Sequence, residues 1–108
     1  LIDVLQLDIR RGGFFGALQL AKLGEPAGAV TISHNWASQI GILMAMHLSK
    51  VVKAIPMIED DRSKLDAIVA TGYEFANGSY RVSNEPGLGI RIDSKVYAEQ
   101  SESREKVV

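Results

Sequence analysis

The chain is organised around the stretch Val30-Thr31-Ile32-Ser33-His34-Asn35-Trp36. This stretch is typical of a short apolar strand that ends on a histidine, with a helix starting just after it. A similar strand, Val4-Leu5-Gln6-Leu7-Asp8, ends on a carboxylate 26 residues earlier, and Ala54-Ile55-Pro56-Met57-Ile58-Glu59 ends on another 25 residues later. In parallel α/β folds, side chains at the carboxyl ends of strands face the ligand site. Asp8, His34 and Glu59 each stand at the end of a strand, at nearly equal spacings along the chain. This regular spacing suggests that their side chains share one catalytic face.

Helical segments are predicted between these strands. Paired glycines at 12–13 allow a tight turn, and residues 14–23 then place their apolar side chains on one helical stripe. The longest periodic segment is 35–50, with Asn35 or Ser38 as its candidate N-cap. Residues 1–60 thus read β-α-β-α-β, which implies a parallel sheet with right-handed crossovers. Doubly wound sheets and (β/α)₈ barrels share this pattern, so the pattern alone leaves both open.

Beyond Glu59 the character of the sequence changes. Residues 64–70 are compatible with a short helix, and turn signals at Asn77-Gly78 and 85–87 accompany strand-like runs at 79–83 and 89–93. The polar end, 101–108, is expected to fray.

Composition narrows the classes of function. The formal charge of -1 gives no electrostatic reason to expect nucleic acid or an anionic membrane as partner. The absence of cysteine excludes disulfides and thiolate metal sites and fits a reducing compartment, so the cytoplasm is the expected location. The 108 residues make one small domain or part of a larger one. Because the chain opens on strand-like residues with no lead-in, we expect it to be a piece of a longer protein.

The strand-end residues suit acid–base chemistry. An Asp that accepts a hydrogen bond from one imidazole nitrogen raises the basicity of the other, so Asp8 and His34 would form a general base that works near neutral pH. Glu59 would hydrogen-bond a substrate oxygen or hold developing negative charge. Each has a plainer alternative: an exposed histidine, a turn-capping Asp8, and a solvated Glu59 in the acidic run 59–61.

Neighbouring side chains are candidates for substrate binding. Arg10 would contact an anionic substrate, although a solvated loop arginine is an equal alternative. Trp36 would line a pocket or cover the helix start, and Asn35 stands between it and His34. His47 lies mid-helix among apolar neighbours, which favours a packing role.

The order of these residues resembles a known family. Asp8 followed by Gly12-Gly13, then residues 33–36, then a strand ending in Glu59, then Glu85-Pro86-Gly87-Leu88-Gly89 with a closing strand, is similar to the carboxyl-terminal part of the enolase superfamily. Within it, the sequence resembles the mandelate racemase-like branch, which includes acid-sugar dehydratases. The likeness covers residues 2–97. The muconate-lactonizing branch would carry a Lys at the position of Asp8, so the Asp here favours the His-Asp type.

This resemblance implies a fold and a site. The fold would be the last part of a (β/α)₇β barrel, a TIM-barrel variant, with residues 2–8, 29–33 and 53–58 as its last three strands. Residues 1–71 would form the partial barrel, and residues 72–108 would pack on a capping domain. His34 would be the general base paired with Asp8, and Glu59 would contact the substrate carboxylate or enediolate. A Mg²⁺ ion is implied, with its ligands on upstream strands that this chain does not contain.

The resemblance therefore predicts part of a hydro-lyase that removes the α-proton of a sugar-acid carboxylate, inactive as this chain alone and homo-oligomeric in the full protein. A racemase or epimerase on the same scaffold is the nearest alternative. A non-catalytic flavodoxin-like α/β module is the alternative from another class.

Overall fold

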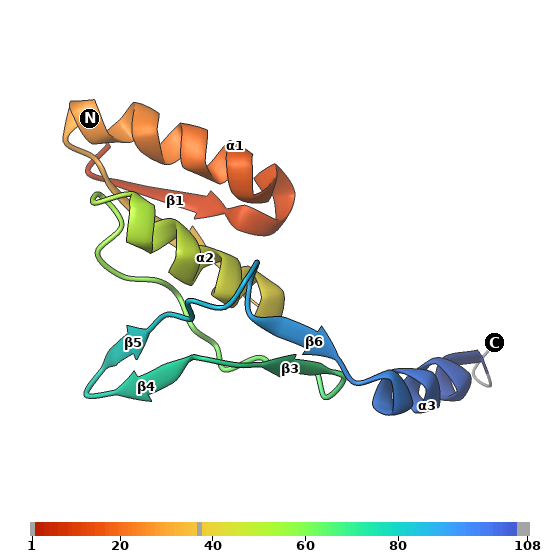
Figure 1. Cartoon of the computed structure of the whole chain (residues 1–108). Helices are drawn as coiled ribbons and strands as arrows, with labels where there is room; N and C mark the ends of the chain where they lie inside the picture. Colours follow the sequence, from red (N-terminus) through yellow and green to blue (C-terminus); the bar gives the residue numbers. More distant parts are fainter. Residues whose placement is uncertain (1, 37, 106–108) are drawn as a thin grey trace. The chain divides into compact units, whose positions relative to one another are not determined.

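The computed structural model describes residues 2–36 and 38–105 and contains two compact units, Leu1–Ser63 and Lys64–Val108. The first unit contains β1 (Val4–Asp8), α1 (Ile9–Gly24), the short 3₁₀ helix η1 (Glu25–Ala27), β2 (Val30–His34) and α2 (Gln39–Val51). The second contains β3 (Ile68–Ala70), β4 (Glu74–Ala76), β5 (Ser79–Arg81), β6 (Ile90–Ile92) and α3 (Ser94–Glu105) (Figure 1). The assignment of residues 72–108 to a capping domain stays a prediction.

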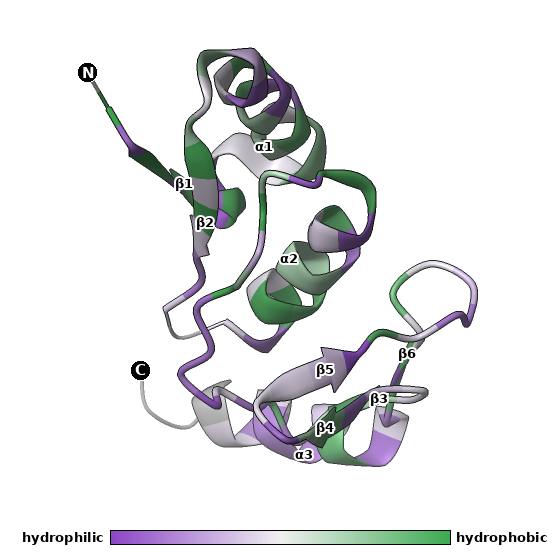
Figure 2. Cartoon of the chain, turned by 90° about the vertical axis from the view of Figure 1, so that its left-hand side faces the viewer, coloured by the Kyte–Doolittle hydropathy of each residue, from purple (hydrophilic) through white to green (hydrophobic). Residues whose placement is uncertain are grey.

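A parallel pair of strands organises the first unit. β1 and β2 pair in a register that runs from Val4 opposite Val30 to Asp8 opposite His34. Helices α1 and α2 both lie on one side of this pair (Figure 2). The β-α-β-α part of the predicted pattern is therefore confirmed. The helices end within one residue of the predicted positions, but α1 begins at Ile9 and not at residue 14, and α2 begins at Gln39 and not at residue 35.

Local sequence explains both helix starts. The Asp8 carboxylate accepts hydrogen bonds from the main-chain N–H groups of Arg10 and Arg11, so it caps α1. Gly13 adopts φ 66° and ψ 174° and kinks the first part of α1, which is the unusual backbone conformation predicted for the paired glycines. Ser38 caps α2 by accepting from the N–H of Gly41 at 3.0 Å, so the cap is Ser38 and not Asn35.

The core of the first unit lies between the sheet and its helices. It joins residues from β1, both helices and the segment after α2: Leu7, Ile9, Ala17, Ala21, Ala45, Leu48, Val52 and Ile55. Phe14 and Leu18 pack against it, as the predicted helical stripe requires. The opposite face of the sheet is open, since Val4 and Val30 on that face remain 50% and 37% exposed.

The third strand predicted at 53–58 is not a strand in the structure, and the prediction is wrong in that respect. The segment approaches β2 through one ladder-like bond, from the N–H of Thr31 to the carbonyl of Ala54 at 2.8 Å. Ile55 donates its N–H back to Val52 in a turn, and Pro56 has no N–H to donate. The segment therefore runs beside β2 without forming a regular ladder.

The second unit is built from short antiparallel pairs. β3 pairs with β6, and β4 pairs with β5 across the turn Asn77-Gly78. Both turn residues have positive φ, 52° and 76°, as a two-residue type I′ hairpin requires. β5 and β6 match the strand-like runs expected from sequence.

One prediction for the second unit needs correction. Residues 64–70 do not form a helix, because Ile68–Ala70 pair with Ile90–Ile92 as a strand. Helix α3 follows β6, and Asp93 caps it by accepting from the N–H groups of Lys95 and Val96. Residues 101–105 of the end expected to fray form the last part of α3, residues 106–108 lie outside the described part, and the fraying stays a prediction. Among the described residues, no helix has the length and apolar character that crossing a bilayer requires.

Candidate active site

Asp8 and His34 lie side by side at the carboxyl ends of β1 and β2. They are direct partners in the parallel register, so their side chains leave the sheet on the same face. Their neighbours Leu7 and Ser33 are buried on the helix side, which directs Asp8 and His34 to the open face. Both stay partly accessible, with 22% and 39% of their side chains exposed. The sheet thus brings together two of the predicted site residues.

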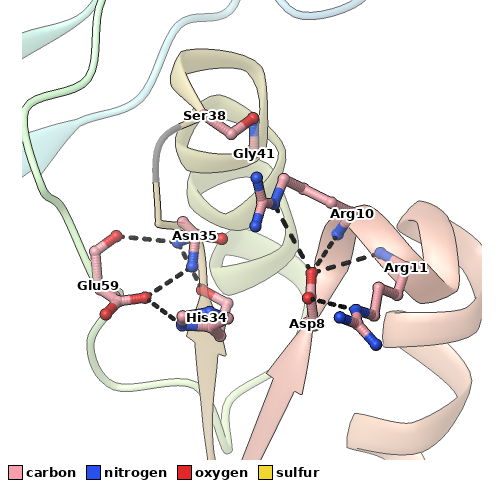
Figure 3. Close-up of polar contacts among 9 residues, drawn as sticks. Asp8, Arg10, Arg11, His34, Asn35, Ser38, Gly41 and Glu59 are labelled. Atoms are coloured by element: carbon pink, nitrogen blue, oxygen red, sulfur yellow. Dashed lines mark hydrogen bonds and ion pairs between the residues drawn. The ribbon is translucent and has the colours of Figure 1, made fainter.

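The carboxylate of Asp8 is bonded to the residues at the start of α1. Besides the two main-chain bonds, its carboxylate forms ion pairs with Nε of Arg10 at 3.8 Å and Nε of Arg11 at 3.3 Å (Figure 3). Within the described part of the chain, no hydrogen bond joins Asp8 to His34. The turn-capping alternative for Asp8 is therefore present in the structure, together with a position beside the histidine.

The partner of the imidazole is Glu59. Nδ1 of His34 lies 2.9 Å from Oε2 of Glu59. An ionised carboxylate can only accept hydrogen bonds, so Nδ1 carries the proton in this contact. In the neutral ring the lone pair then resides on Nε2. This arrangement prepares Nε2 to accept a proton.

Asn35 binds Glu59 through both its main chain and its side chain. Its main-chain N–H donates to Oε2 of Glu59 at 2.7 Å, and its side-chain Nδ2 donates to the main-chain carbonyl of Glu59 at 2.9 Å. Nδ2 also donates to Oγ of Ser33 at 3.0 Å. The bond between Asn35 and Ser33 is buried, whereas the two bonds from Asn35 to Glu59 are partly buried; Figure 3 shows the contacts between Asn35 and Glu59. Sequence reasoning had not identified Ser33, because a serine inside an apolar strand carries no separate signal.

The predicted substrate-binding residues have different environments. Trp36 is 61% exposed, next to the end of β2. Arg10 is 42% exposed at its side chain and pairs with Asp8. Asn35, expected to meet the substrate, is 0% exposed and its amide is bonded to Ser33 and Glu59.

The carboxylates present do not make a magnesium site by themselves. No group of three or more His, Cys, Asp or Glu side chains within residues 2–36 and 38–105 is placed to hold a metal ion. Asp8 is bonded to the start of α1, and Glu59 is bonded to His34 and Asn35. Metal ligands on upstream strands stay a prediction.

Comparison with known proteins gives the family. Residues 1–96 match the family model described as enolase C-terminal domain-like. The chain belongs to this family. The match spans the first unit and residues 64–96 of the second, and it confirms the resemblance to the enolase superfamily.

Solved structures agree with this membership. A Glu-to-Ala mutant of galacturonate dehydratase from Geobacillus sp., complexed with Mg, superposes with a TM-score of 0.82 at 29% identity, covering 94% of this chain and 27% of that one. A mandelate racemase/muconate lactonizing protein from Geobacillus sp. Y412MC10, complexed with magnesium/tartrate, gives 0.81 at 30% identity, covering 90% and 25%. Galacturonate dehydratase from Geobacillus sp., complexed with D-galacturonate and 5-keto-4-deoxy-D-galacturonate, gives 0.75 at 29% identity, covering 90% and 26%.

The chain therefore spans about a quarter of the length of these solved structures. Among curated proteins, none matches the chain.

Proposed function

We propose that this chain is the carboxyl-terminal part of an enolase-superfamily acid-sugar dehydratase, a hydro-lyase that begins by removing the proton α to a carboxylate. The observation that carries the proposal is the contact between Nδ1 of His34 and Oε2 of Glu59, which leaves Nε2 as a base on the open face of the sheet. Its neighbour Asp8 adds negative charge on the same face.

The chemistry assigned to this chain is one proton abstraction and one proton return. Nε2 of His34 takes the α-proton, and the C–H electron pair moves into the enediolate of the substrate. The β C–O bond then breaks, and the departing hydroxide leaves as water after it receives the proton from the imidazolium. The enol product tautomerises to a keto acid, so the net change is the loss of one water.

Glu59 and Asp8 support the charge changes on His34. The Glu59 carboxylate orients the ring and stabilises the imidazolium that forms when Nε2 is protonated. Asp8 lies directly opposite His34 in the register and contributes a second, more distant negative charge. Arg10 and Trp36, which are accessible and follow the ends of β1 and β2, are proposed contacts for the acid and the sugar part of the substrate.

The rest of the active site is proposed from the family. Strands β1 and β2 would be consecutive strands near the end of a (β/α)₇β barrel, the second unit would belong to the capping domain, and the complete enzyme would be a cytoplasmic homo-oligomer. Mg²⁺ held by upstream carboxylates would stabilise the enediolate when bound. A sugar acid is the proposed substrate class, because one similar structure is complexed with D-galacturonate.

A racemase is the second candidate, supported by the 30% identity to the mandelate racemase/muconate lactonizing protein. It would use the same abstraction by His34 but return a proton to the opposite face of the α-carbon. Solvent deuterium incorporation without loss of water would indicate racemisation. Loss of water would indicate dehydration.

The test is a chimera in which this chain replaces the matching quarter of the Geobacillus sp. galacturonate dehydratase. We expect the chimera to dehydrate a sugar acid, and His34→Asn to lower kcat by about 10²–10⁴-fold, as loss of a general base does. The matched control is His47→Gln, which changes the other histidine of the chain, in α2, and should leave kcat close to that of the parent. Equal rates for the parent chimera and His34→Asn would refute the role of His34.

A further inference from the structure

Asn35 lies beside the proposed base but is not accessible to a substrate in this unit. Its side chain is 0% exposed, on the face of β2 that also buries Thr31 and Ser33. His34 extends to the opposite, open face, because successive side chains of a strand alternate. The side chains of Asn35 and His34 therefore lie on opposite faces of the sheet at the end of β2.

Asn35 holds Glu59 at two points. The main-chain N–H of Asn35 fixes the carboxylate through Oε2 at 2.7 Å, and Nδ2 fixes the main chain of Glu59 through its carbonyl at 2.9 Å. The second proton of Nδ2 goes to Oγ of Ser33 at 3.0 Å, which sets the plane of the amide. Oδ1 of Asn35 is buried and accepts no hydrogen bond from the described residues, so the contribution of the side chain lies in its Nδ2 donors.

The atom held by Asn35 is the atom that meets the imidazole. Oε2 of Glu59 accepts from the Asn35 N–H and from Nδ1 of His34, and Glu59 belongs to a segment without regular strand pairing. We infer that Asn35 is a positioning residue: by fixing Glu59 it holds His34 in the Nδ1–H tautomer, with the Nε2 lone pair directed to the open face. The tautomer is a property of the chain, and only its catalytic consequence rests on the proposed function.

The test reads the tautomer directly. The full chain is labelled with ¹⁵N-histidine, and the Nδ1 and Nε2 shifts of His34 are recorded at alkaline pH, where the imidazole is neutral. We expect Nδ1–H in the parent chain. We expect a shift toward Nε2–H in Asn35→Asp, which keeps the shape but replaces the donor by an acceptor facing the Glu59 carbonyl, and in Asn35→Ala, which removes the donor.

Ser38→Ala is the matched control. It removes the side-chain cap of α2 and so weakens the same part of the unit without touching Glu59. We expect Ser38→Ala to keep the Nδ1–H tautomer. The inference is overturned if the parent chain shows Nε2–H, or if both Asn35 variants keep Nδ1–H.

If the Asn35 variants do not fold, hydrogen exchange measured on the unmodified chain tests the positioning role of Asn35. The Nδ2 protons of Asn35 are buried and bonded to Ser33 and Glu59, so they should exchange slowly with solvent. Fast exchange of these protons in a folded chain would overturn the inference.

The catalytic consequence is measured in the chimera. Asn35→Ala should lower kcat about 10–100-fold, the usual cost of losing a residue that orients a functional group, with little change in KM. A changed tautomer with an unchanged kcat would refute the proposed base and leave the positioning intact. An unchanged tautomer, with His34→Asn inactive, would refute the positioning and leave the base intact.

Discussion

Nδ1 of His34 lies 2.9 Å from Oε2 of Glu59, although Asp8 is the carboxylate directly opposite His34 in the sheet register. The two carboxylates therefore have different direct contacts. Asp8 is bonded to the start of α1, and Glu59 is bonded to the imidazole. Proximity in the sheet does not decide which carboxylate orients the histidine.

Because Glu59 and not Asp8 is bonded to the imidazole, we expect changes at the two carboxylates to lower kcat by different amounts. Glu59→Gln keeps the volume of the side chain but removes the charge bonded to the ring, so in the chimera we expect kcat to fall about 10–100-fold. Asp8→Asn removes a charge that has no hydrogen bond to the ring, so its loss should be smaller. Steady-state kinetics with a sugar acid would compare the two variants. A larger loss in Asp8→Asn would show that Asp8 is the orienting partner.

Asp8 should have a clear effect on stability. Its carboxylate caps α1 through the N–H groups of Arg10 and Arg11, so Asp8→Ala should lower the free energy of unfolding by about 1 kcal/mol. Asp8→Asn keeps a capping oxygen and should lose much less, because Asn is an equally good N-cap. Urea denaturation of the full chain followed by circular dichroism would measure both. Equal losses in the two variants would contradict the capping role.

Two glycines of α1 form a matched pair with opposite expected signs. Gly13 has φ 66° and ψ 174°, a conformation nearly restricted to glycine, so Gly13→Ala should destabilise the unit by about 1–3 kcal/mol. Nothing lies within 4 Å of an added Cβ at either Gly13 or Gly16, which isolates the backbone effect from any clash. Gly16 has no positive φ, so Gly16→Ala should stabilise by about 0.5–1 kcal/mol. The same denaturation experiment would test this, and a loss of stability in Gly16→Ala would be the contrary result.

We expect His47 to make the stability of the first unit depend on pH. Partial burial, followed by the nearby charge of Lys50, lowers the pKa of His47 in the folded chain below its usual value of about 6.5. The unfolded chain then binds the proton at higher pH than the folded chain does. Stability is therefore full above about pH 6.5 and falls as the pH drops from there toward the folded pKa.

His47→Gln should flatten this part of the stability profile, which denaturation between pH 4 and 8 (roughly the window in which histidine titrates) would measure. Lys50→Gln should raise the pKa of His47 part of the way back, as followed by NMR titration. A profile that His47→Gln leaves unchanged would assign the pH dependence to other groups.

Much of the first unit could be predicted because its signals are local. Alternating and continuous apolar residues marked β1 and β2, the stripe through Ala17 and Ala21 marked the buried face of α1, and the paired glycines marked its kink. The turn at Asn77-Gly78 was equally readable, since both residues tolerate positive φ. The series from Asp8 and Gly12-Gly13 through residues 33–36 and Glu59 to the turn at 85–89 indicated the family, which the match confirms.

The remaining features depend on contacts between distant segments. The segment at 53–58 has the composition of a strand, but a strand is defined by its hydrogen-bond ladder, and Ile55 and Pro56 offer no donors to β2. Residues 64–70 are compatible with a short helix from sequence, but the pairing of Ile68–Ala70 with β6 overrides this weak local preference.

Local preferences in the sequence are enough to place Asp8 and His34 at the ends of β1 and β2, because strand and turn preferences act over a few neighbouring residues. They do not determine that Glu59 meets His34, or that a fully buried Asn35 holds Glu59 in place. Those contacts join residues 24 and 25 positions apart, so only the folded path of the chain after α2 brings them within hydrogen-bond distance.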